Sequence, residues 1–294
     1  MIPRRALLRT LVAIGCSFAL TIPASAASFT SDRISVKTSG SGKDVILIPG
    51  LSSSPRVWTE MMQAVPGYRY HLVQVAGFAG VPKGGNAEGV IAAPVAAEIA
   101  RYIKDEKLNK PALIGHSMGG TMGLMIAARH PDAVSKLMVV DMLPFLGKLF
   151  GPQMTTESVK PIAASLQAQV SNPDPAQRKL RVEAAIASMV NTQAMRQAAV
   201  DDGLGSDIDV SARAYHELFV TDLMPELPKI AVPTTVLYVN PKAMGKTDAQ
   251  IGELYQGSYA GLKQGKVKFF PDSAHFIMWD QPARFAAEVK AFLE

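Results

Sequence analysis

The chain has 294 residues, of which 48% are hydrophobic and 19% are charged. This is the composition of an ordinary globular protein with a large core, and it excludes low-complexity disorder, collagen-like repeats and disulfide-stapled scaffolds. The formal net charge is +5, but three arginines lie within the first ten residues. Because no basic cluster is interleaved with aromatic residues, we expect no nucleic-acid partner.

Residues 1–26 have the three-part pattern of a secretory signal peptide. A basic stretch is followed by an apolar run at 11–20 and by small residues at 24–26. The sequence therefore predicts an exported protein, periplasmic or secreted. An arginine pair at positions 4 and 5 also resembles a twin-arginine signal, so both export routes stay open.

Cys16, the single cysteine, lies inside this segment. The residues before it weakly resemble a lipobox, which makes lipid anchoring at Cys16 a minor alternative to release. Cleavage after Ala26 leaves a chain without cysteine, which suits an oxidising compartment. Because the apolar run is too short to span a bilayer, no stable transmembrane segment is expected after cleavage.

Beyond residue 26, short apolar runs alternate with helical patterns. The expected strands are 34–38, 45–49, 71–76, 112–115, 136–141, 234–239 and 266–270, and the helices between them are 90–107, 118–129, 248–260 and 282–293. Several runs are continuously apolar, which is typical of strands buried on both faces of a parallel sheet. The predicted fold class is therefore α/β, with a doubly wound, mostly parallel sheet.

One interval, residues 142–229, breaks this alternation. It contains no convincing strand, and helical periodicity recurs at 159–170, 175–191, 193–200 and 210–223. We therefore predict a helical cap inserted into a core domain that comprises residues 27–141 and 230–294. Methionines in the insertion are explained either as a flexible lining for substrate or as packing between its helices.

The most specific motif is Gly-His-Ser-Met-Gly-Gly at residues 115–120, between an apolar run and a helical pattern. A Gly-x-Ser-x-Gly sequence in this context forms a sharp turn that exposes the serine above the sheet. Gly115 and Gly119 permit the tight turn and the close approach of helix to strand. Ser117 is therefore the predicted nucleophile; the alternative is a serine that merely caps the helix.

A serine hydroxyl is a weak nucleophile at neutral pH and needs a base. His275 follows the last predicted strand, so its loop can return to the sheet edge above Ser117. We predict that His275 is the base. None of the five histidines shows metal-ligand spacing, so no metal site is expected. The oxyanion donors are expected to be the backbone N–H groups of Met118, after the nucleophile, and Leu51, after the strand 45–49.

These residues resemble the α/β-hydrolase superfamily over nearly the whole chain beyond residue 26. Further landmarks are Pro-Gly-Leu at 49–51, Ala-Arg-His-Pro at 128–131 and Gln-Pro-Ala-Arg-Phe at 281–285. The resemblance implies Ser–acid–His catalysis through an acyl-enzyme, without a cofactor. It also places a helical cap where residues 142–229 lie.

The triad acid is where the chain departs from the family pattern. Its usual place follows the strand 234–239, but no carboxylate occurs there until Asp248, at the start of a predicted helix. Asp141 ends the preceding strand, where some family members place the acid. Both candidates keep the order Ser, Asp, His. We choose Asp141, with Asp248 as the alternative; Asp272 is too near His275 in sequence to be preferred.

The sequence thus predicts an exported serine hydrolase, esterase-like, whose partner is a small apolar ester. A cofactor-free haloperoxidase or lyase is an alternative, because such enzymes resemble this fold and triad. A non-catalytic binding protein that kept the fold is an alternative of another class. The identity of the substrate and the oligomeric state are not predicted.

Overall fold

A computed structural model describes residues 29–241 and 244–294 of the chain. The predicted signal peptide and Cys16 lie outside the described residues. Within these two ranges, no helix is both long enough and apolar enough to cross a membrane.

Seven strands form one sheet in the order β1-β3-β2-β4-β5-β6-β7. β1 is antiparallel to β3, and all other neighbouring strands are parallel. The prediction of a doubly wound, mostly parallel sheet is confirmed, and each expected strand matches one observed strand. The bounds are β1 Ile34–Gly40, β2 Lys43–Ile48, β3 Tyr68–Val75, β4 Ala112–His116, β5 Lys136–Val140, β6 Thr234–Tyr238 and β7 Gly265–Phe269.

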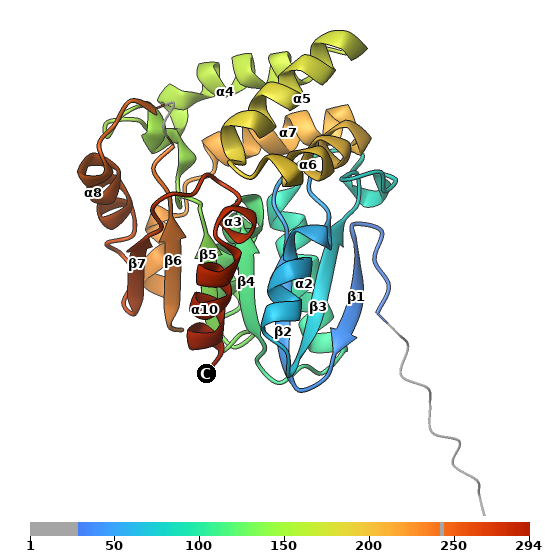
Figure 1. The fold of residues 1–294 in the computed structure, drawn as a ribbon, viewed down its shortest axis with the longest axis vertical. Coiled ribbons are helices and arrows are strands. Elements are labelled where there is room, and N and C mark those ends of the chain that lie inside the picture. Colours follow the sequence, from blue (N-terminus) through green and yellow to red (C-terminus); the bar gives the residue numbers. More distant parts are fainter. Residues whose placement is uncertain (1–28, 242–243) are drawn as a thin grey trace, which may run out of the picture.

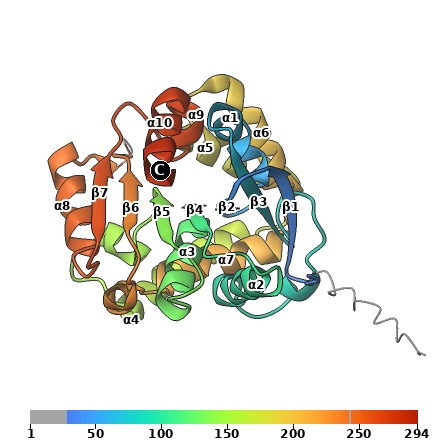
Figure 2. The same ribbon diagram turned by 90° about the horizontal axis from the view of Figure 1, so that it is seen from below.

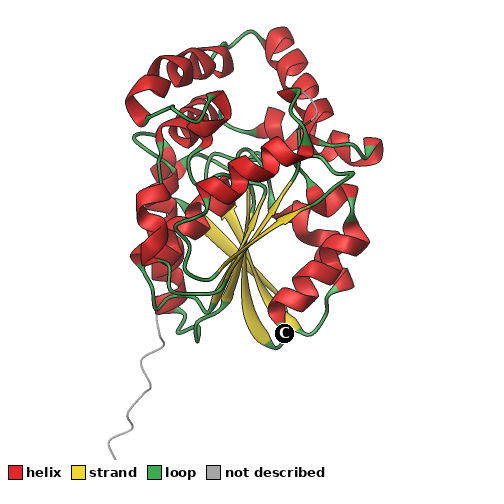
Figure 3. Ribbon diagram, turned by 90° about the vertical axis from the view of Figure 1, so that its left-hand side faces the viewer, coloured by secondary structure: helices red, strands yellow, loops and turns green. Residues whose placement is uncertain are grey.

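Helices cover both faces of this twisted sheet (Figures 2 and 3). α2 and α3 lie on one face, and α1, α9 and α10 lie on the other. α8 lies beside β7 at the edge of the sheet (Figure 1). Their bounds are α1 Thr59–Ala64, α2 Ala92–Asp105, α3 Met118–Arg129, α8 Asp248–Ser258, α9 Ile277–Asp280 and α10 Pro282–Leu293, with short 3-10 turns at Pro55–Trp58 and Gly84–Asn86.

The apolar run of β2 shows why the sheet is buried on both sides. Successive side chains of a strand point to opposite faces. Ile46 and Ile48 therefore join the core cluster beneath α2 and α3, whereas Val45 and Leu47 join the cluster that contains Trp58. All five side chains are almost inaccessible to solvent, and burial of each aliphatic one contributes about 1.5–3 kcal/mol.

The elements between β5 and β6, in the fully described stretch 141–233, are all helical. Figure 1 shows α4–α7 gathered over the end of the sheet at which β5 leads into them, the carboxyl end of the parallel strands. We call residues 142–229 the helical insertion. It contains α4 Thr156–Val170, α5 Pro175–Met189, α6 Gln193–Gly205 and α7 Ile208–Val220, between 3-10 segments at Leu146–Phe150 and Met224–Lys229.

α4 begins three residues before the periodicity that predicted it, because a capping box precedes the apolar positions. The Thr155 hydroxyl accepts from the backbone N–H of Ser158, and the Ser158 hydroxyl accepts in return from the N–H of Thr155. This exchange satisfies amides that have no intrahelical acceptor. Pro161 lies inside α4, within the predicted helical range 159–170.

Candidate active site

Ser117 occupies the turn between β4 and α3 in a strained conformation. Its φ of 53° and ψ of −123° lie outside the regions that non-glycine residues usually adopt, at a cost of about 1–3 kcal/mol. Surrounding bonds hold the strain: the Ser117 N–H donates to the Val140 carbonyl at 2.9 Å, and the Ser117 carbonyl accepts from the N–H of Gly120 at 2.7 Å. The serine is thus fixed by the neighbouring strand and by the first turn of α3.

The two glycines of the motif are required by close backbone contacts. A Cβ atom on Gly119 would lie 2.2 Å from the carbonyl oxygen of Ile48. A Cβ atom on Gly115 would lie 2.2 Å from the carbonyl oxygen of Gly119. Because the clashing atoms belong to the backbone of the sheet and of the helix, any larger residue would force α3 away from the sheet.

His275 lies in the loop between β7 and α9 and contacts Asp141, which directly follows β5. Its Nδ1 is 2.6 Å from the Oδ2 atom of Asp141. A short hydrogen bond to a carboxylate fixes the orientation of the ring. When Nδ1 carries the proton, the neutral imidazole presents Nε2 as its acceptor.

The other oxygen of Asp141 is held by the core of the protein. Oδ1 accepts hydrogen bonds from the backbone N–H of Val239 and from the hydroxyl of Tyr255, both at 3.1 Å. Burial, together with the negative charge of Asp141, raises the pKa of Tyr255 well above 10. The phenol therefore stays protonated and donates to the carboxylate. Asp141 itself is buried, so these donors replace the water that it loses.

His116 joins the serine turn to the loop of His275. Its Nε2 lies 3.0 Å from the backbone carbonyl of His275, and the two ring centroids are 4.6 Å apart. Since a carbonyl only accepts, Nε2 of His116 is the protonated nitrogen. Full burial, reinforced by the charge of His275, lowers the pKa of His116 well below 6.5. His116 is therefore a neutral side chain that supports the loop of His275 beside Ser117.

The loop that follows β2 passes directly over Ser117. A Cβ atom on Gly50 would lie 3.0 Å from the Cβ of Ser117, so Leu51, the next residue, also lies near the serine. Among the described residues, the N–H of Leu51 donates no hydrogen bond. Met118 is the first residue of α3, where an N–H has no intrahelical acceptor. Both amides predicted to bind an oxyanion are thus available close to Ser117.

Asp248, the alternative acid, has a different environment at the start of α8. Its Oδ1 accepts from the Asn240 side chain at 2.7 Å, and it follows Thr247, which caps the helix. In the two described ranges, no hydrogen bond or ion pair joins Asp248 to His275. Of the two candidate acids, the structure therefore brings Asp141 to the histidine.

Residues 45–288 match the model of the alpha/beta hydrolase family. The chain belongs to this family. The resemblance inferred from the motifs is thereby confirmed, and so is the expectation of a hydrolase.

Two curated relatives and one solved structure illustrate the similarity to other alpha/beta hydrolases. The pimeloyl-[acyl-carrier protein] methyl ester esterase of Vibrio atlanticus is 23% identical over 274 residues, which are 90% of this chain and 99% of the relative. The enzyme of the same name from Aeromonas hydrophila is 32% identical over 112 residues, 38% of this chain. That alignment spans 42% of the Aeromonas protein.

The solved structure, a hydrolase from Pseudomonas aeruginosa, superposes with a TM-score of 0.72 at 16% identity, over 88% of this chain and 94% of the other. Such a likeness shows the shared fold and does not specify a substrate. In the described part of the chain, no group of three or more His, Cys, Asp or Glu residues could hold a metal ion.

Two tyrosines that hold the residues after β5 belong to no recognisable sequence motif. Tyr255 and Tyr259 are four residues apart, and the Tyr259 hydroxyl donates to the carbonyl of Met142 at 2.6 Å. Together they hold both residues that follow β5. The spacing of the two tyrosines in a predicted helix was the only signal in the sequence, but such a pair usually indicates packing between helices rather than hydrogen bonds to a buried carboxylate.

Proposed function

We propose that the chain is a serine hydrolase that cleaves a small apolar ester with Ser117, His275 and Asp141 as its triad. The observation that carries the proposal is the 2.6 Å contact between His275 and Asp141 next to a strained serine turn. The names of the two esterase relatives support ester cleavage. The buried surroundings of Ser117 agree with an apolar substrate.

In the proposed reaction, Nε2 of His275 accepts the proton of the Ser117 hydroxyl as its oxygen attacks the ester carbonyl. The N–H groups of Leu51 and Met118 hold the resulting oxyanion. Collapse of this intermediate releases the alcohol, which takes the proton from His275. Water then attacks the acyl-enzyme by the same steps. Asp141 keeps His275 in the required tautomer and stabilises its charged form.

The domain division and the cellular location belong to the same proposal. Residues 27–141 and 230–294 form the catalytic core, and residues 142–229 form a cap over the carboxyl ends of the strands. Export of the mature chain, to the periplasm or beyond, is supported by the pattern of residues 1–26. The catalytic steps above need no cofactor, since each proton transfer uses His275.

The proposal is tested with the Ser117→Ala variant of the mature protein. Hydrolysis of p-nitrophenyl esters of increasing acyl length should fall by about 10⁴-fold or more, and labelling by a fluorophosphonate should disappear. The matched control is Ser188→Ala, an exposed serine in α5, which should retain both. Thermal unfolding should be nearly unchanged in both variants.

Two results would contradict the proposal in different ways. Turnover that persists in Ser117→Ala would place the nucleophile elsewhere. A wild-type protein that neither hydrolyses esters nor reacts with the fluorophosphonate would instead be a binding protein with a hydrolase fold.

A further inference from the structure

A buried carboxylate in the helical insertion binds the loop that carries Leu51. Asp202 lies in α6 and is only 2% exposed. Its Oδ2 accepts from the backbone N–H of Ser54 at 2.9 Å and from the Ser54 hydroxyl at 2.7 Å. Its Oδ1 pairs with the guanidinium of Arg56. All these donors belong to the segment after β2.

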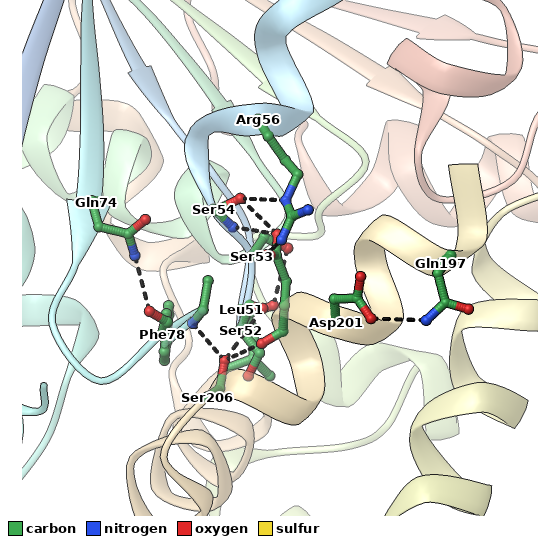
Figure 4. A network of polar contacts seen from close by, with 12 residues as sticks. Leu51, Ser52, Ser53, Ser54, Arg56, Gln74, Phe78, Gln197, Asp201 and Ser206 are labelled. Atoms are coloured by element: carbon green, nitrogen blue, oxygen red, sulfur yellow. Dashed lines mark hydrogen bonds and ion pairs between the residues drawn. The ribbon is translucent and has the colours of Figure 1, made fainter. Parts of the chain in front are cut away.

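This segment is itself a compact turn, so the anchor at Ser54 acts on Leu51. The N–H of Ser53 donates to the Gly50 carbonyl at 3.2 Å, and the Ser53 hydroxyl donates to the carbonyl of Leu51 at 3.3 Å. Arg56 also donates to the Ser54 hydroxyl at 3.0 Å. Figure 4 shows Leu51, Ser53, Ser54 and Arg56 clustered around the turn.

A second set of contacts ties the middle of the turn to the insertion. Ser52 has a positive φ of 54°, which is uncommon for a residue with a side chain. Its hydroxyl lies 2.8 Å from the hydroxyl of Ser211 in α7, and its carbonyl accepts from the Ser206 hydroxyl at 3.4 Å. The conformation of the turn therefore depends on α6 and α7, not on the sheet alone.

The electrostatics make Asp202 the strongest of these contacts. A buried carboxylate that loses its donors is strongly destabilising, so the hydrogen bonds of Asp202 fix α6 relative to the turn. Oxyanion stabilisation needs an N–H about 2.7–3.1 Å from the developing charge. A displacement of about 1 Å in a catalytic group can lower the rate about 10²-fold. Rigid support of Leu51 is therefore a requirement of the chemistry.

We propose that Asp202 is a positioning residue that, through Ser54, sets the backbone N–H of Leu51 for the oxyanion. The inference rests on the proposed function and extends it: the helical insertion completes the oxyanion site and does more than cover the substrate.

The test compares Asp202→Asn with Asp201→Asn in the mature protein. Asp201 is the exposed neighbour on the same helix, and it accepts from Gln197 (Figure 4). For p-nitrophenyl ester hydrolysis, Asp202→Asn should lower kcat about 10- to 100-fold, in keeping with a displaced donor, and leave KM nearly unchanged. Asp201→Asn should change neither parameter appreciably. Ser54→Ala keeps the backbone donor to Asp202, so its loss of kcat should be smaller.

Two further measurements separate positioning from general structural damage. Affinity for a phenylboronic acid, which forms a tetrahedral adduct with the serine, should weaken by the same factor as kcat/KM. The pH profile of kcat/KM should keep its shape, because His275 and Asp141 are untouched.

Unchanged kcat in Asp202→Asn would refute the inference, as would a rise in KM alone. An altered pH profile of kcat/KM would also refute the inference, because the substitution would then affect the triad. A lower fraction of enzyme labelled by the fluorophosphonate would refute it as well, because the substitution would then affect the fold. If Asp202→Asn does not fold, Ser54→Ala decides by the same criteria. Wild-type protein inert toward both ester and fluorophosphonate would show instead that the proposed function had failed.

Discussion

The carboxylate that binds His275 and the loop that carries Leu51 lie at the same edge of the sheet but are held by different parts of the chain. Asp141 is supported by the core: its N–H donates to the Leu237 carbonyl at 2.8 Å, and Val239 and Tyr255 donate to its side chain. The loop of Leu51 is supported by the helical insertion. Strand β6, the residue after it and helix α8 therefore hold Asp141, whereas α6 and α7 of the helical insertion hold the loop of Leu51.

The loop of His275 is held both by the core and by the helical insertion. Asp280 accepts the N–H of Ala274 at 2.8 Å, and it also accepts the N–H groups of Asn191 and Thr192 in the insertion. The histidine is thus bound to the acid of the core on one side and adjoins a loop tied to the insertion on the other. Changes in the insertion should consequently affect the oxyanion loop first and Asp141 last.

We expect the greatest loss of activity when Asp141, which the core holds, is replaced. Asp141→Asn should lower kcat by about 10⁴-fold, the loss seen when the orienting carboxylate of a serine triad is replaced. Asp248→Asn, at the start of α8, should lower it by no more than a few-fold. Steady-state ester hydrolysis measures both. Similar, mild losses in the two variants would mean that neither carboxylate is the acid.

A smaller effect is expected when the support of the acid is weakened but the acid is kept. Tyr255→Phe removes one donor to Asp141, and hydrogen bonds to charged groups contribute about 1.5–3 kcal/mol. We expect kcat to fall about tenfold, and KM to change little. Tyr215→Phe, which alters a tyrosine of the insertion packed against Phe219, serves as the control. Equal losses of kcat in the two variants would show that the hydrogen bond from Tyr255 to Asp141 does not contribute to activity.

The smallest effect concerns stability and pH. The pKa of His116 is lowered in the folded state, so below about pH 6.5 the unfolded chain binds a proton that the folded chain does not. The free energy of unfolding should therefore fall with decreasing pH, by up to about 1.4 kcal/mol per pH unit from this residue. Above that range the contribution of His116 is constant.

His116→Gln isolates this component, because glutamine retains a donor for the carbonyl of His275 but does not titrate. Urea unfolding of both proteins should be followed from about pH 7.5 to pH 5. The stability of the wild type should decrease more steeply than that of the variant. Parallel curves would show that His116 takes up its proton equally in both states.

The strands and the serine turn were predictable because their signals are local. Continuous apolar runs indicate buried strands wherever they occur, and the glycines of 115–120 meet steric demands within a few residues of Ser117. The helical insertion was also visible as a loss of strand patterns. The first residues of its helices could not be predicted as well, since the polar residues that cap α4 lie outside the apolar periodicity.

The candidate acid shows where sequence reasoning stopped. Asp141 and Asp248 both fit the order of a triad, and nothing local distinguishes them. Their surroundings differ only in three dimensions: Asp141 meets a histidine 134 residues away, whereas Asp248 accepts from nearby Asn240. The role of Asp141 as the triad acid is still a prediction, but its contact with His275 is a feature of the fold.

The seven strands, the longer helices, the family and the serine turn could be predicted from the amino-acid sequence, because they follow from hydrophobic periodicity and backbone sterics over short stretches. The short helices α1 and α9 were not predicted. Two contacts became evident only from the fold: Asp141 binds His275, and Asp202 binds Ser54, 148 residues away. Such contacts depend on how the insertion and the core pack together. The pattern of residues along the chain does not show which distant residues come into contact.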